Sequence, residues 1–423
     1  MNVQSKKPIT AAEQSLLDRY SERRDALQGD ASVTELRDGL VHDFAQTGLP
    51  GRRIETWHYT DLRTLLKSAP SDFSAEAGAS AKPIVPDSIV LSARNDCQDS
   101  AIPDGMDVSS FKELLASERA TDLLASKRSD DFIGRVNSMF VDGGSVVEVS
   151  KGAKLEKTIE FQNASLGGHL HTRMSVNIGE GASGTFIERQ IAAGKTDSFV
   201  SSITDLTIGK GAAVTWIISQ ERGVSDTHLG QINIRLGEDA RLTLFIANAG
   251  GHLVRQEVHV TADGENSDFA LRGVNLLGGD SHTDITMEFD HLVANCVSAE
   301  TLRNVVFDRA RGVFQGQIRV AQIAQKTDAK MACNTLLLSD EGEFFSKPEL
   351  EIFADDVQCG HGATVTDIDE NHLFYLKARG ISDSKARAML VNAFISEIVE
   401  DLEQEDLVEA FENRFSEWLA QHA

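Results

Sequence analysis

The chain is short of the residues and motifs that mark several common protein classes. Its 423 residues include only seven prolines and, beside 20 phenylalanines, only three tyrosines and three tryptophans. The four cysteines are far apart and form no C-x-x-C pair, which argues against a structural zinc site and predicts reduced thiols. No G-x-S-x-G or H-E-x-x-H motif is present, and the G-K-T at 194–196 lacks the first glycine of a P-loop. The sequence therefore carries no signature of a serine hydrolase, a zinc protease or an ATPase.

Basic charge and long apolar runs are also scarce. Lysine and arginine total 41 against 65 acidic residues, a net charge of −24, which repels nucleic acid and anionic lipid. No stretch reaches the roughly 18 apolar residues of a membrane span, and the N-terminal residues MNVQSKKPIT lack the apolar core of a secretory signal. These absences predict a cytoplasmic protein that binds neither nucleic acid nor membrane.

The N-terminal part of the chain has a helical pattern up to about residue 66. Thr10 with Glu13, and Ser32 with Glu35, have the spacing of a capping box, so each pair predicts the start of a helix. The segment 48–51, Gly-Leu-Pro-Gly, is predicted to end the second helix. Residues 68–84 are rich in Ser, Ala and Pro, as linkers are. We interpret residues 1–100 as an N-terminal helical region with a linker.

Glycine is abundant, at 33 residues, and many glycines lie in a repeated turn. From about residue 140 to 365 short alternating strands are separated by turns whose third positions are residues 152, 181, 211, 239 and 264. A spacing of about 25 to 30 residues is typical of a parallel β-helix, whereas a β-sandwich would place turns every 8 to 12 residues. We therefore predict a parallel β-helix core over residues 101–365.

Helical periodicity returns in residues 366–423. Apolar residues from Ile381 to Trp418 form one stripe, and many glutamates and aspartates lie on the opposite face. A solvated acidic face is the favoured interpretation, with a charged docking surface as the alternative. These residues form the predicted C-terminal helical domain.

Two pairs of side chains are candidate metal ligands. In a strand, residues two apart share a face, so Cys359 and His361 are predicted to lie side by side. A thiol and an imidazole can hold a soft or borderline metal such as iron, but a packed cysteine and a hydrogen-bonded histidine fit the pattern equally well. His169 and His171 also share a face, but no third ligand is near them in sequence. We expect them to be solvent-exposed strand histidines.

Several segments resemble one known family. Residues 347–357, 359–364 and 374–381 strongly resemble the SufB/SufD family of iron–sulfur cluster assembly proteins, and residues 55–61 resemble the N-terminal signature of its SufD branch. The longer SufB branch often has an N-terminal cysteine motif, which is absent here. The resemblance implies a right-handed parallel β-helix between N-terminal and C-terminal α-helical regions.

The resemblance also implies a function. Such a chain is a scaffold without enzymatic turnover that pairs with a SufB-like paralogue through the β-helix, or forms a homodimer when isolated. It implies that His361, beside Cys359, lies where iron or a nascent iron–sulfur cluster is held transiently. No cofactor is expected to bind tightly, and a reduced flavin is compatible with the assembled complex. A SufC-like ABC ATPase is expected to bind the C-terminal helices around Arg379, Gly380, Ile381, Ala386, Leu390 and Phe394.

Two other functions would suit this fold. A homodimeric β-helix scaffold without a metal role agrees with the fold prediction and is the alternative. A β-helix polysaccharide lyase or hydrolase would require a secretory signal and a Tyr- and Trp-rich groove, and the sequence has neither.

Overall fold

The computed structural model describes residues 8–70, 72–73, 81–94, 102–117, 119–125, 128, 130–194 and 197–422. Cys97 and residues 195–196 of the G-K-T segment lie outside these ranges. Within them, no helix is long and apolar enough to cross a membrane.

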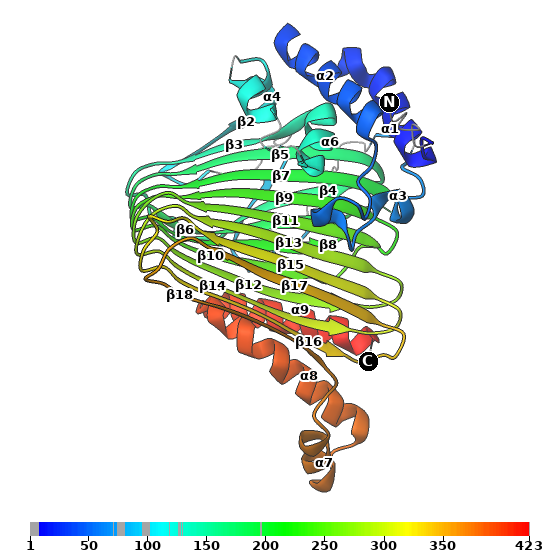
Figure 1. The fold of residues 1–423 in the computed structure, drawn as a ribbon, viewed down its shortest axis with the longest axis vertical. Coiled ribbons are helices and arrows are strands. Elements are labelled where there is room, and N and C mark those ends of the chain that lie inside the picture. The colour runs from blue at the N-terminus through cyan, green and yellow to red at the C-terminus, as the bar shows by residue number, and fades with distance from the viewer. Residues whose placement is uncertain are drawn as a thin grey trace.

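The chain alternates between two nine-stranded sheets and so winds into a coil (Figure 1). Neighbouring strands within each sheet are parallel, apart from the antiparallel pair β2 and β3. This topology confirms the parallel β-helix and excludes a sandwich, whose sheets are antiparallel. The first sheet contains, in order, β1 (Ile89–Ser92), β4 (Ile159–Ser165), β6 (Ser183–Ala192), β8 (Ala213–Glu221), β10 (Arg241–Asn248), β12 (Asp268–Leu277), β14 (Val297–Val306), β16 (Asp328–Leu337) and β18 (Gln358–Thr366). The second contains β2 (Met106–Ser110), β3 (Gly143–Val149), β5 (Gly168–Ile178), β7 (Ser198–Ile208), β9 (Thr227–Leu236), β11 (Leu253–Ala262), β13 (His282–His291), β15 (Arg311–Val320) and β17 (Glu343–Ile352).

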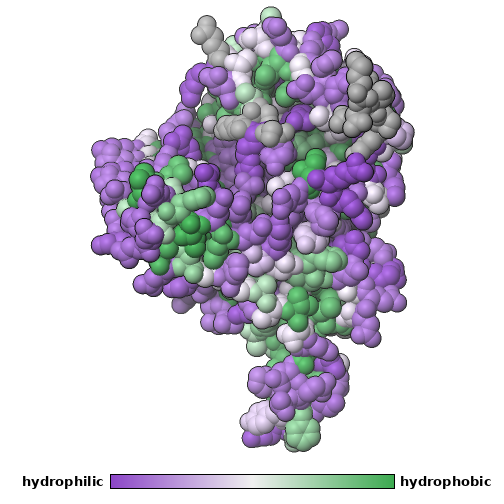
Figure 2. Space-filling model, viewed as in Figure 1, coloured by the Kyte–Doolittle hydropathy of each residue, from purple (hydrophilic) through white to green (hydrophobic). Residues whose placement is uncertain are grey.

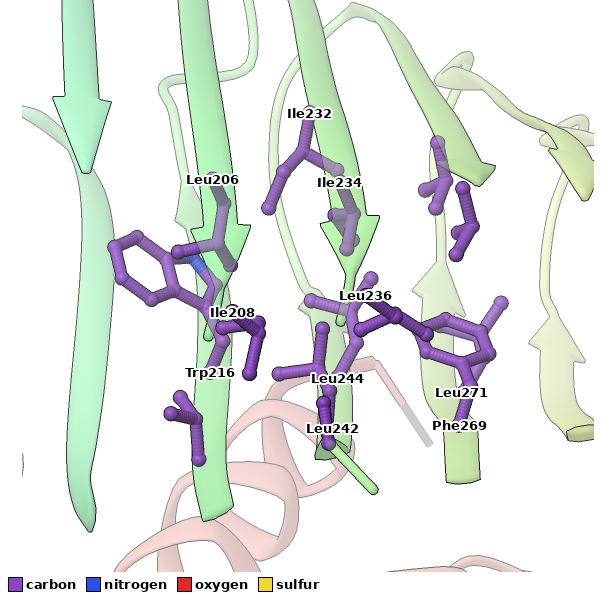
Figure 3. Packing of buried hydrophobic residues seen from close by; sticks show 14 of the residues in the cluster. Leu206, Ile208, Trp216, Ile232, Ile234, Leu236, Leu242, Leu244, Phe269 and Leu271 are labelled. Atoms are coloured by element: carbon purple, nitrogen blue, oxygen red, sulfur yellow. The ribbon is translucent and has the colours of Figure 1, made fainter. Parts of the chain in front are cut away.

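Alternate side chains fill the inside of the coil. Figure 3 shows Leu206 and Ile234 from the second sheet packed against Trp216 and Leu244 from the first. All four are at most 2 % exposed. The two sheets thus enclose one continuous apolar core.

The repeated turns contain left-handed residues in register. Gly181 and Gly211 have φ of 65° and 63°, and the amide of Gly181 donates to the carbonyl of Lys210 in the next turn at 2.8 Å. At the fifth turn the prediction was wrong by two residues: the left-handed residue is Asn266 (φ 59°), not Gly264. Asparagine tolerates this conformation better than most residues, so the turn does not need glycine.

Replacing Gly181 with alanine is expected to lower the free energy of unfolding by about 1–2 kcal/mol, because φ of 65° strains an L-residue. An added Cβ would contact nothing within 4 Å, so the effect isolates backbone strain. Gly360→Ala is the control, since its Cβ is equally unobstructed and its φ is not left-handed. Urea unfolding measures the free energy of unfolding of both variants. Equal values for Gly181→Ala and Gly360→Ala would contradict backbone strain at residue 181.

Helices cover the outer face of the second sheet at one end of the coil (Figure 1). Thr10 caps the first helix in a capping box with Glu13, as predicted, and Gly48 ends the second. The second cap was predicted wrongly, because Asp30 rather than Ser32 accepts from the amide of Val33. The helices are α1 (Ala11–Arg23), α2 (Ala31–Thr47), α3 (Leu62–Leu65), α4 (Phe111–Leu115), α5 (Ala120–Leu124) and α6 (Phe132–Phe140), with short 3₁₀ helices η1 (Arg24–Ala26) and η2 (Glu55–Trp57).

Three further helices follow the last strand: α7 (Glu370–Ala378), α8 (Asp383–Val399) and α9 (Glu405–His422), with η3 (Glu400–Leu402) before α9. Helices α8 and α9 pack on the outer face of the first sheet, where Phe411 contacts Phe245. Part of the acidic face of this region is used in ion pairs: Glu397 of α8 pairs with Arg303 at 2.7 Å, and Asp401 of η3 pairs with Arg272 at 2.5 Å. Helix α7 extends beyond the coil (Figure 1).

Candidate functional site

Cys359 and His361 lie in β18, at the end of the first sheet. We call β17, β18 and residues 353–357 between them the terminal coil. Parallel register pairs Cys359 with Ala329 and His361 with Met331, which both belong to the buried core. Paired residues point to the same side of a sheet, so Cys359 and His361 face the inside of the coil. His361 is nevertheless exposed and Cys359 only half-buried, because no further coil in the described part of the chain covers them.

Apolar side chains are exposed around this end of the coil. Ile352 is 40 % exposed, Phe353 52 % and Val365 47 %. Figure 2 shows a hydrophobic area on the left side of the view. Leu292 and Ile323, in turns between strands, are also exposed. Open strand edges beside apolar surface are typical of a surface that pairs with another protein.

A thiol and an imidazole are two of the donor types that a metal site uses. Burial raises the pKa of Cys359, and the charge of Asp328 adds to this rise, while the opposing backbone hydrogen bond with Ala329 does not reverse it, so the thiol keeps its proton at neutral pH. Among the described residues, no group of three or more histidines, cysteines and carboxylates is close enough to hold a metal ion. Cys359 and His361 can therefore supply only part of a ligand set.

The predicted ATPase-binding residues differ in exposure. Arg379 and Gly380 are exposed between α7 and α8. Ala386 is fully buried, and Ile381, Leu390 and Phe394 are half-buried against the apolar cluster that the C-terminal helices form with the outer face of the first sheet. The Arg303 guanidinium lies 4.8 Å from the centre of the Phe394 ring. Much of the predicted apolar stripe is therefore used inside the protein.

Exposed apolar residues of α7 and α8 were not among the predicted site residues. Phe374 is 73 % exposed, Tyr375 56 % and Met389 42 %. Helical periodicity could have identified Phe374 and Tyr375, because Leu373 is the buried residue of α7 and its neighbours in sequence point away.

His169 and His171 were wrongly predicted to be exposed. They are 1 % and 2 % exposed, because Phe73 and Phe140 cover the outer face of β5. His169 Nδ1 and His171 Nε2 are 3.3 Å apart, and the remaining ring nitrogens contact the Pro70 carbonyl and the Ser201 hydroxyl. Every ring nitrogen is engaged, so this pair has no nitrogen left for a metal.

The segment 55–61 attaches the N-terminal region to the coil. Trp57 is buried, with the Arg255 guanidinium 3.8 Å from the centre of its ring. The Thr60 hydroxyl donates to Asp284 and lies 3.0 Å from His282 Nε2. This density of aromatic residues therefore has a structural role in docking.

Sequence comparison agrees with this architecture. Residues 161–394, more than half of the chain, match the model described as the SufBD core domain of SUF-system iron–sulfur cluster assembly, and residues 10–90 match the SufBD N-terminal region. The chain belongs to the SufBD family. Over 376 residues it is 28 % identical to the iron–sulfur cluster assembly protein SufD of Escherichia coli, covering 87 % of this chain and 88 % of SufD.

Two other SufBD relatives show the breadth of the family. A SufBD family protein of Synechocystis is 26 % identical over 408 residues, with 88 % of each chain covered. SufB of Bacillus subtilis is 25 % identical over 284 residues, covering 66 % of this chain and 61 % of SufB. The chain is thus an iron–sulfur cluster assembly protein of the SUF system and a homologue of SufD.

Proposed function

We propose that this SufBD protein is the SufD-like, non-catalytic scaffold of a cytoplasmic assembly complex. In this proposal its terminal coil pairs with a SufB-like paralogue, and iron or a nascent cluster is held between the two chains as cargo. The observation that carries the proposal is the open terminal coil, which combines unpaired strand edges with Cys359 and His361 facing inward.

Pairing explains why the site is incomplete in one chain. Iron–sulfur clusters are held mainly by thiolates, with imidazoles in some centres. A partner docked on β17 and β18 would continue both sheets, cover the exposed apolar residues and add the missing ligands. The proposal needs no tightly bound cofactor in this chain, and a reduced flavin, as electron donor, would act on the assembled complex.

An ATPase partner would supply the nucleotide chemistry that this chain lacks. We assign its docking surface to α7 and the first half of α8, where Phe374, Tyr375 and Met389 are exposed and the Arg379 guanidinium lies 4.8 Å from the centre of the Tyr375 ring. Only residues 367–369 separate β18 from α7. Movement of α7 by an ABC-type ATPase would therefore act directly on the strand that carries His361.

His361→Ala is expected to lower cluster yield by about tenfold or more without dissociating the complex, because the variant removes a candidate ligand from an exposed position. His42→Ala is the matched control, since His42 is also exposed but lies on α2, away from β18 and α7. Anaerobic reconstitution of the complex, followed by ultraviolet–visible and Mössbauer spectra, measures the yield. Wild-type yield in His361→Ala would contradict the role of His361.

The same open end could also pair with a second copy of this chain, which is the alternative of a homodimer without a metal role. Co-purification separates the two functions. A SufB-like paralogue together with an ABC-type ATPase supports the proposed complex, whereas a homodimer with neither of them supports the alternative.

A further inference from the structure

Glu300 is a buried carboxyl inside the coil, close to the candidate site. Its side chain is fully buried and no donor meets hydrogen-bond geometry at either carboxyl oxygen, although the Ser298 hydroxyl and its own amide are close enough to lower its pKa. Its register neighbours, Leu271 and Met331, are apolar. Glu188, also inside the coil, differs because its carboxylate accepts hydrogen bonds from Thr204 and Gln190, both at 2.8 Å. A charged carboxylate without such partners is strongly disfavoured in an apolar interior, so Glu300 requires an explanation.

Glu300 is uncharged at neutral pH. Burial raises its pKa to about 8, and the smaller opposing effects of the Ser298 hydroxyl, its own backbone amide and Arg272 do not reverse this. The nearby His291, bonded to Ser298 at 3.2 Å, provides no positive charge, because burial lowers its pKa to about 4. The interior beneath the terminal coil therefore holds a proton on a carboxyl group.

The position of Glu300 connects it with the candidate site. Glu300 pairs with Met331, and Met331 pairs with His361, so the three side chains form one inward-facing row. Two strand spacings separate Glu300 from His361, which corresponds to about 10 Å. When it is ionised, Glu300 raises the pKa of Cys359, as does Asp328, which itself pairs with Lys330.

We propose that Glu300 is the internal counter-charge for a cation held by Cys359 and His361: it is a neutral acid while the site is empty and a carboxylate once a divalent cation binds. This inference rests on the proposed cation role of the terminal coil. On binding, the Cys359 thiol loses its proton and forms a sulfur–metal bond, and Glu300 loses its proton without becoming a ligand. Both protons leave to solvent, and the two negative charges balance the cation.

The distance between Glu300 and the cation determines how strongly the bound cation favours ionisation of Glu300. A net charge of +1 to +2 at about 10 Å, at the effective dielectric constant of a protein, raises the acid dissociation constant of Glu300 roughly ten- to a hundredfold. From a pKa of about 8, this is enough to ionise at least about half of Glu300 at pH 7. Binding should therefore release about half a proton or more beyond that of the thiol.

The test uses cobalt(II) as the probe, titrated into the full chain by calorimetry at pH 7 in buffers of different ionisation enthalpy. The slope against ionisation enthalpy gives the protons released per cobalt. Glu300→Gln keeps the shape of the neutral acid. We expect the number of protons that it releases per cobalt to be lower than that of the wild type by about half a proton or more. Glu188→Gln, a buried interior carboxyl with its own partners, should match the wild type. A cobalt–thiolate absorption band that is present in all three proteins and lost in Cys359→Ala would establish that Cys359 binds the ion.

The outcomes separate this inference from the proposed function. Cobalt binding that is lost in His361→Ala, with equal proton release from the wild type and Glu300→Gln, would overturn only the role of Glu300. Absence of cobalt binding to the wild-type chain would overturn cation binding by Cys359 and His361 of a single chain, and the role of Glu300 with it, but not the proposed function, in which a partner completes the ligand set. Between pH 6.5 and 7.5 the affinity of the wild type should also rise more steeply than that of Glu300→Gln.

Discussion

Replacing Arg255 with methionine is expected to lower the free energy of unfolding by about 3–5 kcal/mol and to release the N-terminal helices from the coil. Arg255 is fully buried and donates to Glu257 at 2.9 Å, to Asp284 at 2.5 Å and to the Thr56 carbonyl at 2.8 Å. Burial alone would raise the pKa of Glu257, but Arg255 and His259 bring it to about 2. Methionine would therefore leave two acidic groups buried without their cation.

The same substitution removes the contact that holds segment 55–61. The Arg255 guanidinium stacks on Trp57, so its loss exposes the N-terminal region to proteases as well as destabilising the coil. Arg235→Met is the control, because Arg235 is 69 % exposed and pairs with Asp263 at the surface, where such a pair contributes about 0–1 kcal/mol. Urea unfolding and limited proteolysis measure both effects. A loss of less than about 1 kcal/mol in Arg255→Met would contradict this account of the ion-pair network.

The coil was predictable because its turns repeat in the sequence. Turns at 152, 181 and 211 need a left-handed residue at every pass, and glycine marks them. The later turns were harder to locate, since Asn266, Asn295 and other non-glycine residues take the same conformation. That Cys359 and His361 share a face followed from the period of two residues in a strand, but the inward direction of that face and the exposure of the two side chains depend on the coil.

What could not be predicted depends on contacts between distant segments. The burial of His169 results from Phe73 and Phe140, which reach β5 from other parts of the chain. The half-burial of Phe394 requires Arg303 on β14. The burial of Glu300 was not predictable for a related reason. A glutamate in an alternating strand gives the same sequence pattern whether its side chain faces the interior or the solvent. Periodicity gives the face of a residue within its own strand or helix, but not what covers that face.

Acidification from pH 7 to about 4 is expected to unfold the protein, because the folded protein buries five uncharged histidines. Burial lowers the pKa of His169, His282 and His291 to about 4, and that of His171 and His228 well below 6.5. The unfolded chain takes up these protons near pH 6.5, whereas the folded chain does not. Stability is therefore complete above pH 6.5 and is lost as the pH falls toward 4.

The free energy of unfolding that is lost on acidification is comparable to the whole stability of a domain. A difference of 2.5 between a pKa of 6.5 and one of about 4 corresponds to about 3 kcal/mol for each of His169, His282 and His291. Glu300 opposes the loss, because its raised pKa makes the folded state bind an extra proton between pH 8 and 4.5. That gain is about 3 kcal/mol between pH 7 and 4.5, so it offsets about one histidine.

Urea unfolding at a series of pH values measures this loss, with an expected slope near pH 5 of about 1 kcal/mol per pH unit for each buried histidine. His291→Gln should reduce this slope by about 1 kcal/mol per pH unit, because it removes one buried histidine from the inside of the coil. The Nδ1 of His291 has no hydrogen-bond partner, so the substitution loses no bond there. His361→Ala should leave the slope unchanged, since His361 is exposed. A free energy of unfolding that stayed constant from pH 7 to 4.5 would show that the buried histidines are protonated in the folded protein, and the burial of uncharged imidazoles would then be wrong.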